Sequence, residues 1–406
     1  MKKIVVTGMG AVTPVGIGVE NYWNNITAGA SGIDTIKTFD PSELAVQIAG
    51  EVKDFNPSDY LPKDLIRKTD PFMQYAYIAA EEAMKQSGIK IEPERTGIVM
   101  GTAMAGIATI AYTQEALTGA SHKKVGPRFI PKILGNIAAA NIAIDYNIQG
   151  PSFTVSTACS SGGDAINTAC MCMQSGKADI MLAVGAESVL CPLVIYSLAN
   201  AKALSRRNDS PSTASRPFDV TRDGFVIGEG GGALVLETEE HALARGAKIY
   251  AEIRGCGNTD DAYHVTAPHP EGAIACMKQA ITEAGINPSD IGYINAHGTA
   301  TNKGDTVETS SIKKVFGNTL PYVSSTKGAT GHMMGAGGIT ETITCVKAIE
   351  TGTVPPTINL NEVDPECAGI DFVANTAKKA EINFAMSNAF GFGGQNSSII
   401  VGKYGK

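Results

Sequence analysis

The sequence predicts an α/β protein in which strands alternate with helices through two consecutive halves of the chain. Short apolar runs typical of buried strands are followed by longer stretches with apolar residues at helical spacing. This alternation occurs on both sides of a charged stretch at residues 237–246. Such an order of elements gives sheets covered by helices. The halves share their element order but show no repeat at the level of single residues.

The composition narrows the class of protein further. The chain has 406 residues, enough for one large or two medium domains, with 43% hydrophobic and 18% charged residues. A net charge of −7 argues against general nucleic-acid binding. No apolar run approaches the roughly 18 residues of a membrane helix. The eight cysteines form no C-x-x-C pair, which favours free thiols in a reducing, cytoplasmic setting over disulfides or a zinc site.

The first half is expected to open with a strand at residues 3–7 and a tight glycine loop at 8–14. A nucleotide-binding fingerprint fails there, because Thr13 stands where the last glycine of G-x-G-x-x-G belongs. The apolar stretch 104–117 is expected to line a pocket or a subunit contact. Apolar periodicity predicts helices at 20–28, 63–87 and 131–144, and β-type runs predict strands at 97–101, 153–157, 180–185 and within 224–236.

The charged stretch at 237–246 is the predicted boundary, which divides the chain into residues 1–246 and 247–406. A second series of elements then follows the same alternation. We expect strands at 248–253, 291–296, 322–325, 371–374 and 397–401, with helices at 272–284 and 335–351.

The stretch around Cys159 is the first candidate site. A β-type run is followed by this cysteine and then by small residues that open an uncharged helix. Unpaired N–H groups and the positive end of the helix dipole at that point favour a thiolate, so a lowered pKa is expected. A lone cysteine is equally compatible with a small buried hydrophobic residue. Its function therefore depends on partners elsewhere in the chain.

Three candidate partners lie in the second half. His297 follows the strand at 291–296, and Lys327 and His332 follow the strand at 322–325. Open α/β sheets bind ligands at the C-terminal ends of their strands. Taken singly, a histidine there is explained by packing and a lysine by surface charge, but together they indicate a site. The loop 390–394 is either a mobile loop whose amides reach a ligand or a plain hairpin turn.

Several motifs carry a family resemblance along nearly the whole chain. They are V-T-G-M-G (6–10), T-A-C-S-S (157–161), A-S-R-P-F-D (214–219), R-D-G-F (222–225), N-A-H-G-T (295–299), S-T-K (325–327), T-G-H (330–332) and G-F-G-G (391–394). With them the chain resembles the elongating β-ketoacyl-acyl-carrier-protein synthases, closest to the synthase II type. The resemblance implies a thiolase-like fold of two similar α/β halves in five layers, αβαβα, and a homodimer.

The resemblance also implies a role for each matching residue. Cys159 corresponds to the nucleophile that accepts the acyl group, and His297 and His332 to donors that stabilise the malonyl thioester oxygen. Lys327 corresponds to the lysine that holds these groups in place. The remaining implied roles are an acid near that lysine (Glu308), an oxyanion hole from the amides of Cys159 and Phe392, with Phe392 also as a gate, pantetheine contacts (Thr299, Thr301) and acyl-pocket contacts (Met104, Phe390). No metal or other cofactor is implied.

The reaction implied by the resemblance is a decarboxylative condensation. Malonyl-acyl-carrier protein would extend the acyl group on Cys159 by two carbons, as in fatty acid synthesis. A type II polyketide or polyene ketosynthase uses the same Cys-His-His chemistry and remains the alternative. A thiolase-like acyltransferase is a weaker rival. A non-catalytic interaction subunit fits less well, because Cys159, His297 and His332 are all present.

An acidic carrier protein is the implied partner, and a net-negative enzyme must then present a local basic patch. Half of the candidate side chains are equally well explained as ordinary solvated charges. No nucleic-acid partner and no membrane insertion are expected. The candidates are Lys63, Arg67, Lys68, Lys123, Lys124, Arg128, Arg206 and Arg207.

Overall fold

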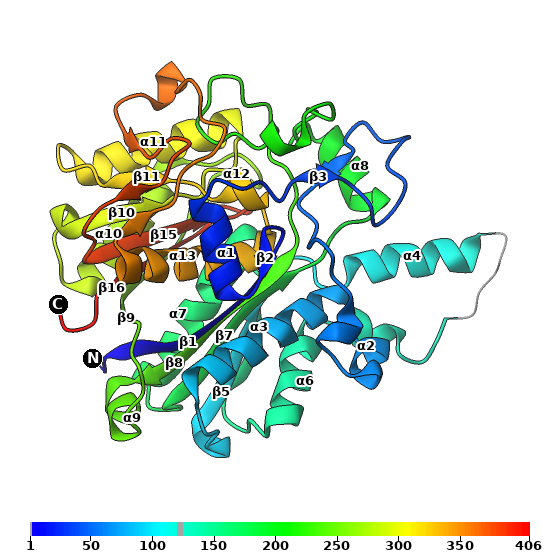
Figure 1. Ribbon diagram of the computed structural model, residues 1–406, viewed down its shortest axis with the longest axis horizontal. Coiled ribbons are helices and arrows are strands. Elements are labelled where there is room, and N and C mark those ends of the chain that lie inside the picture. Colours follow the sequence, from blue (N-terminus) through cyan, green and yellow to red (C-terminus); the bar gives the residue numbers. More distant parts are fainter. Residues whose placement is uncertain (1, 120–124) are drawn as a thin grey trace.

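A computed structural model describes residues 2–119 and 125–406 of the chain (Figure 1). The candidates Lys123 and Lys124 lie outside the described residues. Helices and strands alternate as predicted. The helices are α1 (Val19–Thr27), α2 (Lys63–Lys68), α3 (Pro71–Ser87), α4 (Ile107–Thr118), α5 (Phe129–Ile133), α6 (Asn136–Tyr146), α7 (Ser161–Gln174), α8 (Pro192–Asn200), α9 (Glu239–Ala244), α10 (Pro270–Ala284), α11 (Asn302–Phe316), α12 (Lys327–Thr330) and α13 (Gly337–Thr351).

Strand pairing links twelve strands into one continuous sheet, whose two parts share the same internal order and are called the first and the second sheet below. The short strands β12 and β14, and β3 and β4, pair separately. The first runs β1-β8-β7-β5-β6 and the second β9-β16-β15-β10-β11, with β13 added at its outer edge. The longer strands are β1 (Ile4–Thr13), β5 (Thr96–Gly101), β6 (Ser152–Val155), β7 (Ile180–Glu187), β8 (Gly230–Thr238), β9 (Ala251–Asp260), β10 (Ile291–Asn295), β11 (Tyr322–Ser324), β15 (Phe384–Phe390) and β16 (Gln395–Gly402). The short strands are β2 (Gly16–Ile17), β3 (Asp34–Thr35), β4 (Ile48–Ala49), β12 (Thr353–Val354), β13 (Asp371–Phe372) and β14 (Lys378–Lys379).

The two sheets also share their strand directions. In each, the first two pairings are antiparallel and the next two are parallel. A short antiparallel pairing of β1 with β9 joins the sheets. The prediction of two similar α/β halves is therefore confirmed. The proposed boundary after residue 246 falls between α9 and β9 and remains a prediction.

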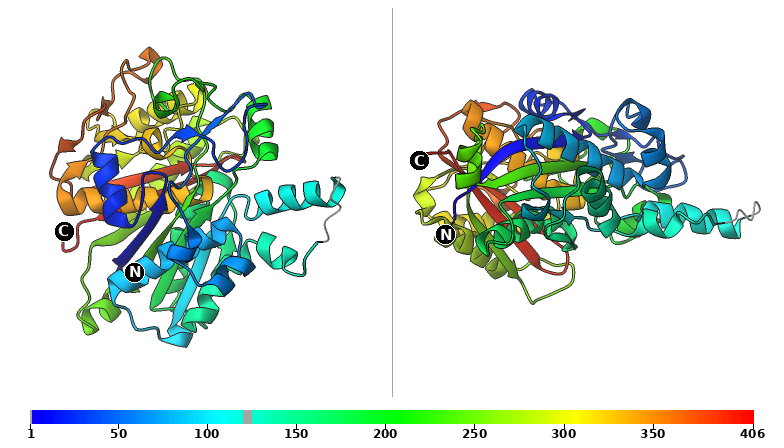
Figure 2. Two further views of the ribbon diagram at one scale, coloured as in Figure 1. Left: turned by 45° about the vertical axis from the view of Figure 1, so that its right-hand side comes forward. Right: turned by 90° about the horizontal axis from the view of Figure 1, so that it is seen from below.

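Helices complete the five layers. Helices α7 and α13 lie between the halves, because each contacts strands of both sheets and they contact one another. On the outer face of the first sheet lie α3 and α6, and on that of the second lies α10, which in turn contacts α11. In Figures 1 and 2, α4 extends away from the body, whereas both chain ends lie on the opposite side. This is the predicted αβαβα order.

The predicted glycine loop at 8–14 is wrong, because β1 continues through it to Thr13. A side chain at Gly8 would place its Cβ 2.1 Å from the carbonyl oxygen of Ala83, and one at Gly10 1.9 Å from that of Ala79. The glycines thus let α3 lie directly on the strand instead of turning the chain.

The helix predicted at 63–87 is interrupted. It ends at Lys68 as α2, and α3 begins at Pro71 with Asp70 as its N-cap, whose side chain accepts from the Phe72 amide at 3.1 Å. Proline disfavours helical geometry in the residue before it, so the break falls there. The predicted helix at 131–144 is likewise two helices, α5 and α6. Helices α8 and α11 and strand β15 were not predicted. None of the helices in the described ranges is long and apolar enough to span a membrane.

Candidate active site

The site lies where loops of the two halves meet at the ends of α7 and α13. The first turns of these helices approach closely through glycines: a Cβ on Gly338 would lie 2.4 Å from the Gly163 amide nitrogen. A Cβ on Gly162 would lie 2.7 Å from the Gly335 carbonyl oxygen. This close approach brings the segment before α7 against the segment before α13.

Cys159 lies in that first segment. After β6 the chain makes a short 3-10 turn, Ala158–Ser160, before α7 begins at Ser161. Ala158 has a φ of 49°, a left-handed conformation that is strained for alanine and that sharpens the turn. Asp164 accepts hydrogen bonds from the hydroxyl groups of Thr157 at 2.5 Å and Ser160 at 3.1 Å, which stabilises the turn. The Cys159 side chain is buried beside Met334, with the two sulfur atoms 4.0 Å apart.

His332 is the immediate partner of Cys159. Its Nε2 atom lies 2.9 Å from the Cys159 Sγ atom. The residue follows α12, and its backbone N–H donates to the Val226 carbonyl at 2.7 Å. Phe225 contacts the imidazole edge-on, at 5.4 Å between ring centroids. Backbone pairing and ring packing thus fix the imidazole against the thiol.

His297 lies beside His332. The two rings are perpendicular, with centroids 5.3 Å apart, and His297 also contacts the ring of Phe390 at 5.8 Å. Glu308 on α11 holds the His297 loop, because its carboxylate accepts from the amides of His297 at 2.9 Å and Gly298 at 2.8 Å. A buried acid thus fixes this turn through its backbone amides.

Lys327 is buried at the start of α12, and its ammonium forms an ion pair with Glu341 on α13. Sequence reasoning missed Glu341 and named only Glu308 as an acid near the lysine. A signal was present, since Glu341 is the one charged residue in the run from 337 to 346. An isolated acid in an otherwise uncharged helix requires a partner, because an unpaired buried charge is costly.

Burial sets the protonation of the central groups. It raises the pKa of the Cys159 thiol to about 11, although the charge of Lys327 and the backbone N–H of Phe392 act in the other direction. The expected lowering of this pKa by the helix start is therefore wrong, because desolvation outweighs it. Burial, followed by the charge of Lys327, holds the pKa values of both imidazoles well below the usual value. At neutral pH the site holds a thiol and two neutral imidazoles.

The other predicted residues surround this centre at different distances. The Phe392 amide reaches Cys159, while its ring is 43% exposed. Met104 packs against the apolar cluster that contains Cys159. The hydroxyl groups of Thr299 and Thr301 lie 3.1 Å apart at the end of the His297 loop, within hydrogen-bond distance of each other.

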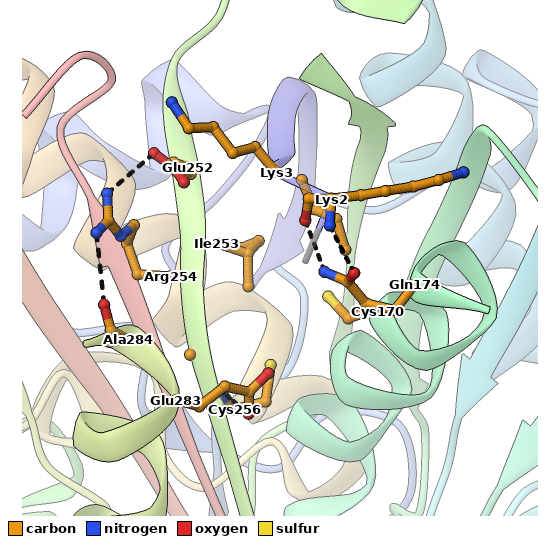
Figure 3. A pocket seen from close by; sticks show the side chains of 12 residues that line it. Lys2, Lys3, Cys170, Gln174, Glu252, Ile253, Arg254, Cys256, Glu283 and Ala284 are labelled. Carbon is orange, nitrogen blue, oxygen red and sulfur yellow. Dashed lines mark hydrogen bonds and ion pairs between the residues drawn. The ribbon is translucent and has the colours of Figure 1, made fainter. Parts of the chain in front are cut away.

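Two surface hollows lie outside this centre. The cavity in Figure 3 has a volume of about 220 Å³ and is lined by residues that include Lys2, Arg254, Cys170 and Cys256, none of them a predicted site residue. A groove of about 570 Å³ beside α4 and α5 is lined partly by Arg67, Arg128 and Lys132. Over the residues that the structure describes, no three His, Cys, Asp or Glu side chains are grouped to hold a metal ion.

Comparison with known proteins adds independent evidence. Residues 1–242 match the model of the beta-ketoacyl synthase N-terminal domain, and residues 250–361 match that of its C-terminal domain. The 3-oxoacyl-(acyl-carrier-protein) synthase 2 of Coxiella burnetii is 44% identical over 409 residues, which covers 99% of each chain. The same-named protein of Vibrio cholerae is 43% identical over 98% of each chain.

Solved structures agree on the fold. The ishigamide ketosynthase/chain length factor aligns with a TM-score of 0.92 at 34% identity over 100% of both chains. A type II polyketide synthase ketosynthase, solved in complex with its acyl-carrier protein, aligns with a TM-score of 0.88 at 33% identity over 99% of both chains.

Proposed function

The chain belongs to the β-ketoacyl synthase family, and from this premise we propose that it is a 3-oxoacyl-(acyl-carrier-protein) synthase of fatty acid elongation. The single observation that carries the chemistry is the contact of the Cys159 thiol with a buried, neutral imidazole, beside a second imidazole. The relatives that bear this name are 44% and 43% identical, above the 33% identity of the polyketide ketosynthase. The fatty acid assignment is therefore preferred to the polyketide alternative.

The first step is transfer of an acyl group to Cys159. The Sγ atom attacks the thioester carbonyl of an acyl-carrier protein, and the carrier's sulfur leaves as the new thioester forms. The thiol proton passes to Nε2 of His332, which is within hydrogen-bond distance, and from there to the leaving sulfur. In this proposal the amides of Cys159 and Phe392 form the oxyanion hole that stabilises the negative charge on the carbonyl oxygen; the effect of the Phe392 N–H on the Cys159 thiol supports its part in this.

The second step is condensation with a malonyl group. Loss of CO2 leaves an enolate, whose oxygen takes hydrogen bonds from the Nε2–H groups of His297 and His332. His332 uses a bare Nε2 atom in the first step, so its ring proton must move from Nδ1 to Nε2 before the second. Neutral imidazoles suit this role, because they donate hydrogen bonds without giving up a proton. The enolate carbon attacks the thioester carbonyl of acylated Cys159, and the thiolate leaves as the two-carbon extension forms. Lys327, held by Glu341, places a positive charge near the developing anion.

Other predicted residues fit the path of the substrate. Thr299 and Thr301 present neighbouring hydroxyl groups that suit the amides of a pantetheine arm. Met104 borders the apolar cluster around Cys159, as a wall of an acyl pocket should. Phe390 lies against His297, and the exposed ring of Phe392 suits a gate between the site and solvent. We propose no metal or other cofactor for either step.

The carrier protein would dock at the groove beside α4 and α5. Two predicted cations from separate segments, Arg67 and Arg128, line this groove together with Lys132. The exposed cluster complements an acidic partner and would steer its approach. Arg206 and Arg207 lie on another loop and do not line this groove. A nearby acid does not separate the two sets, because Arg207 is 3.7 Å from Asp223 and Arg67 is 3.1 Å from Asp64. The groove is thus the better-supported part of the proposed basic patch.

A homodimer is proposed from the edge of the first sheet. Strand β6 is outermost there, and its Phe153 is 47% exposed. Ile144 on the neighbouring α6 is 75% exposed. An open strand edge flanked by apolar side chains favours pairing with a second copy. Analytical ultracentrifugation should show a dimer that Phe153→Glu weakens, and a wild-type monomer at micromolar concentration would contradict it.

A cytoplasmic location is proposed from the cysteines. All eight are free and buried, which suits a reducing compartment.

The acylation step gives a direct test of the proposed function. Purified protein is incubated with acyl-acyl-carrier protein, and its intact mass is compared with that of Cys159→Ser. The wild type should gain one acyl group located on Cys159 by peptide mapping. No mass gain with any acyl length would contradict the proposal.

A further inference from the structure

Glu187 is a buried acid for which the reaction just proposed has no use. It is the last residue of β7 and is 0% exposed. Its carboxylate accepts four hydrogen bonds. They come from the amides of Ala103 at 2.6 Å, Met104 at 3.0 Å and Gly335 at 3.1 Å, and from the hydroxyl group of Thr102 at 3.1 Å.

These donors belong to two different turns. Residues 102–104 form the turn between β5 and α4, whereas Gly335 belongs to the 3-10 turn Met334–Ala336 that precedes α13. Each turn includes or adjoins a left-handed residue that is not glycine, with φ of 47° at Ala105 and 46° at Met334. Such conformations persist only where the surroundings hold them in place. Glu187 supplies that support to both turns with one side chain.

Both turns border the space around Cys159. The Sδ atom of Met334 lies 4.0 Å from the Cys159 Sγ atom, and Met104 packs against the same apolar cluster. The Oε2 atom of Glu187 accepts from Ala103 and Gly335 together, so one oxygen joins the two turns. The position of the Met104 turn relative to Cys159 therefore depends on this carboxylate.

A second buried acid provides a contrast. Glu229 is 6% exposed and accepts from the Val52 amide, the Tyr75 hydroxyl and the Ser188 hydroxyl. Burial raises the pKa of Glu187 and of Glu229 to about 7. The two acids thus share burial and hydrogen bonding, but the hydrogen bonds of Glu229 go to neither turn.

We propose that Glu187 is a positioning residue that sets the depth of the acyl pocket relative to Cys159, and thereby the acyl chain lengths that the enzyme accepts. This inference rests on the proposed function. Replacing Glu187 by glutamine puts an NH2 group where one oxygen stood. Whichever oxygen is replaced, at least one N–H donor of the 102–104 turn then faces another donor. The substitution therefore frees the 102–104 turn from the side chain at position 187 without changing the volume that this side chain fills.

The test measures the rate of Cys159 acylation by intact mass over a series of acyl-acyl-carrier proteins with different chain lengths. Wild type, Glu187→Gln and the matched control Glu229→Gln are compared. Glu187→Gln should shift the ratio of long-chain to short-chain rates by at least about tenfold. Glu229→Gln should leave this ratio unchanged.

A Glu187→Gln enzyme whose rates fall by one common factor at all lengths, or do not change, would overturn the inference. If that variant does not fold, Thr102→Val decides, because it removes one donor to Glu187, together with the acceptor of the Ala105 amide in the same turn, with little change in shape. It should shift the ratio in one direction by at least threefold, and an unchanged ratio overturns the inference. Failure of the wild type to acquire any acyl group would instead overturn the proposed function, and this inference with it.

Discussion

The Nε2 atom of His332 lies 2.9 Å from the Sγ atom of Cys159, whereas His297 contacts the ring of His332 rather than the thiol. The two histidines are therefore not equivalent. Under the proposed function, His332 faces the sulfur and serves both acyl transfer and condensation, whereas His297 serves the condensation alone.

Replacing His297 by alanine should separate the two steps. Condensation should fall by about 10²–10³, because one donor to the enolate oxygen is lost. Acylation of Cys159 should change by less than about fivefold, since the contact between His332 and the thiol remains. Intact mass follows acylation, and release of CO2 from malonyl-acyl-carrier protein follows the second step. Equal losses of rate in acylation and in condensation would show that the two histidines do not have separate roles.

Breaking the buried ion pair of Lys327 and Glu341 should lower the free energy of unfolding. Lys327→Met leaves the Glu341 carboxylate buried without its partner, which should lower the free energy of unfolding by about 3–5 kcal/mol. The double variant Lys327→Met, Glu341→Leu should recover most of this loss but still condense poorly. Urea denaturation gives these values. As a control, Lys314→Met breaks an exposed pair with Glu271 and should change stability by less than about 1 kcal/mol. A double variant as unstable as the single one would contradict the pairing.

The raised pKa of the Cys159 thiol predicts a definite pH dependence. Because burial favours the neutral thiol, the thiolate fraction rises about tenfold per pH unit below the pKa of about 11. Alkylation of the free enzyme by iodoacetamide should therefore accelerate steadily from pH 6 to 9 without a plateau. Cys159→Ser reports the background from the other cysteines, all of which are buried. A rate that levels off above pH 7 would mean that the thiolate is already formed.

Charge reversal at the groove should weaken carrier-protein binding. Arg67→Glu and Arg128→Glu should each raise KM for acyl-acyl-carrier protein severalfold with little change in kcat. Added salt should reduce the difference in KM between each variant and the wild type, because it screens the charges. Lys90→Glu makes the same charge change beyond the far end of α3, which is about 25 Å long. An equal effect from Lys90→Glu would point to net charge rather than to a docking site.

Much of the fold could be predicted from the pattern of apolar residues. Strands such as β5 and β7 are uniformly buried, so their runs are continuous and easily recognised. The loop predicted at Gly8 and Gly10 failed because close helix packing, and not a turn, requires those glycines. Helix α11 was missed because much of the face that it buries is polar, including Asp305, Glu308 and Thr309, so the apolar pattern is sparse.

The site residues that were predictable are those that follow a strand end or belong to a family motif. Cys159, His297, Lys327 and His332 are far apart in sequence, and the structure brings them together. The protonation of Cys159 was not predictable, since desolvation depends on the completed packing around the sulfur. Glu187 carried the same signal as Glu341, because it is the one charged residue in the run from 180 to 201. Its role was still not predictable, since that role comes from donors on two distant turns.

A single round of condensation by acylated enzyme distinguishes a condensing enzyme from a protein that only accepts an acyl group. Enzyme carrying an acyl group on Cys159 is freed of acyl donor and mixed with malonyl-acyl-carrier protein, and the carrier-bound product is measured by mass. The acyl mass should disappear from Cys159, CO2 should be released, and a 3-oxoacyl-carrier product two carbons longer than the starting acyl group should form. If the acyl group stays on Cys159 or is only hydrolysed while malonyl-carrier protein is intact, the assignment as a condensing enzyme is wrong.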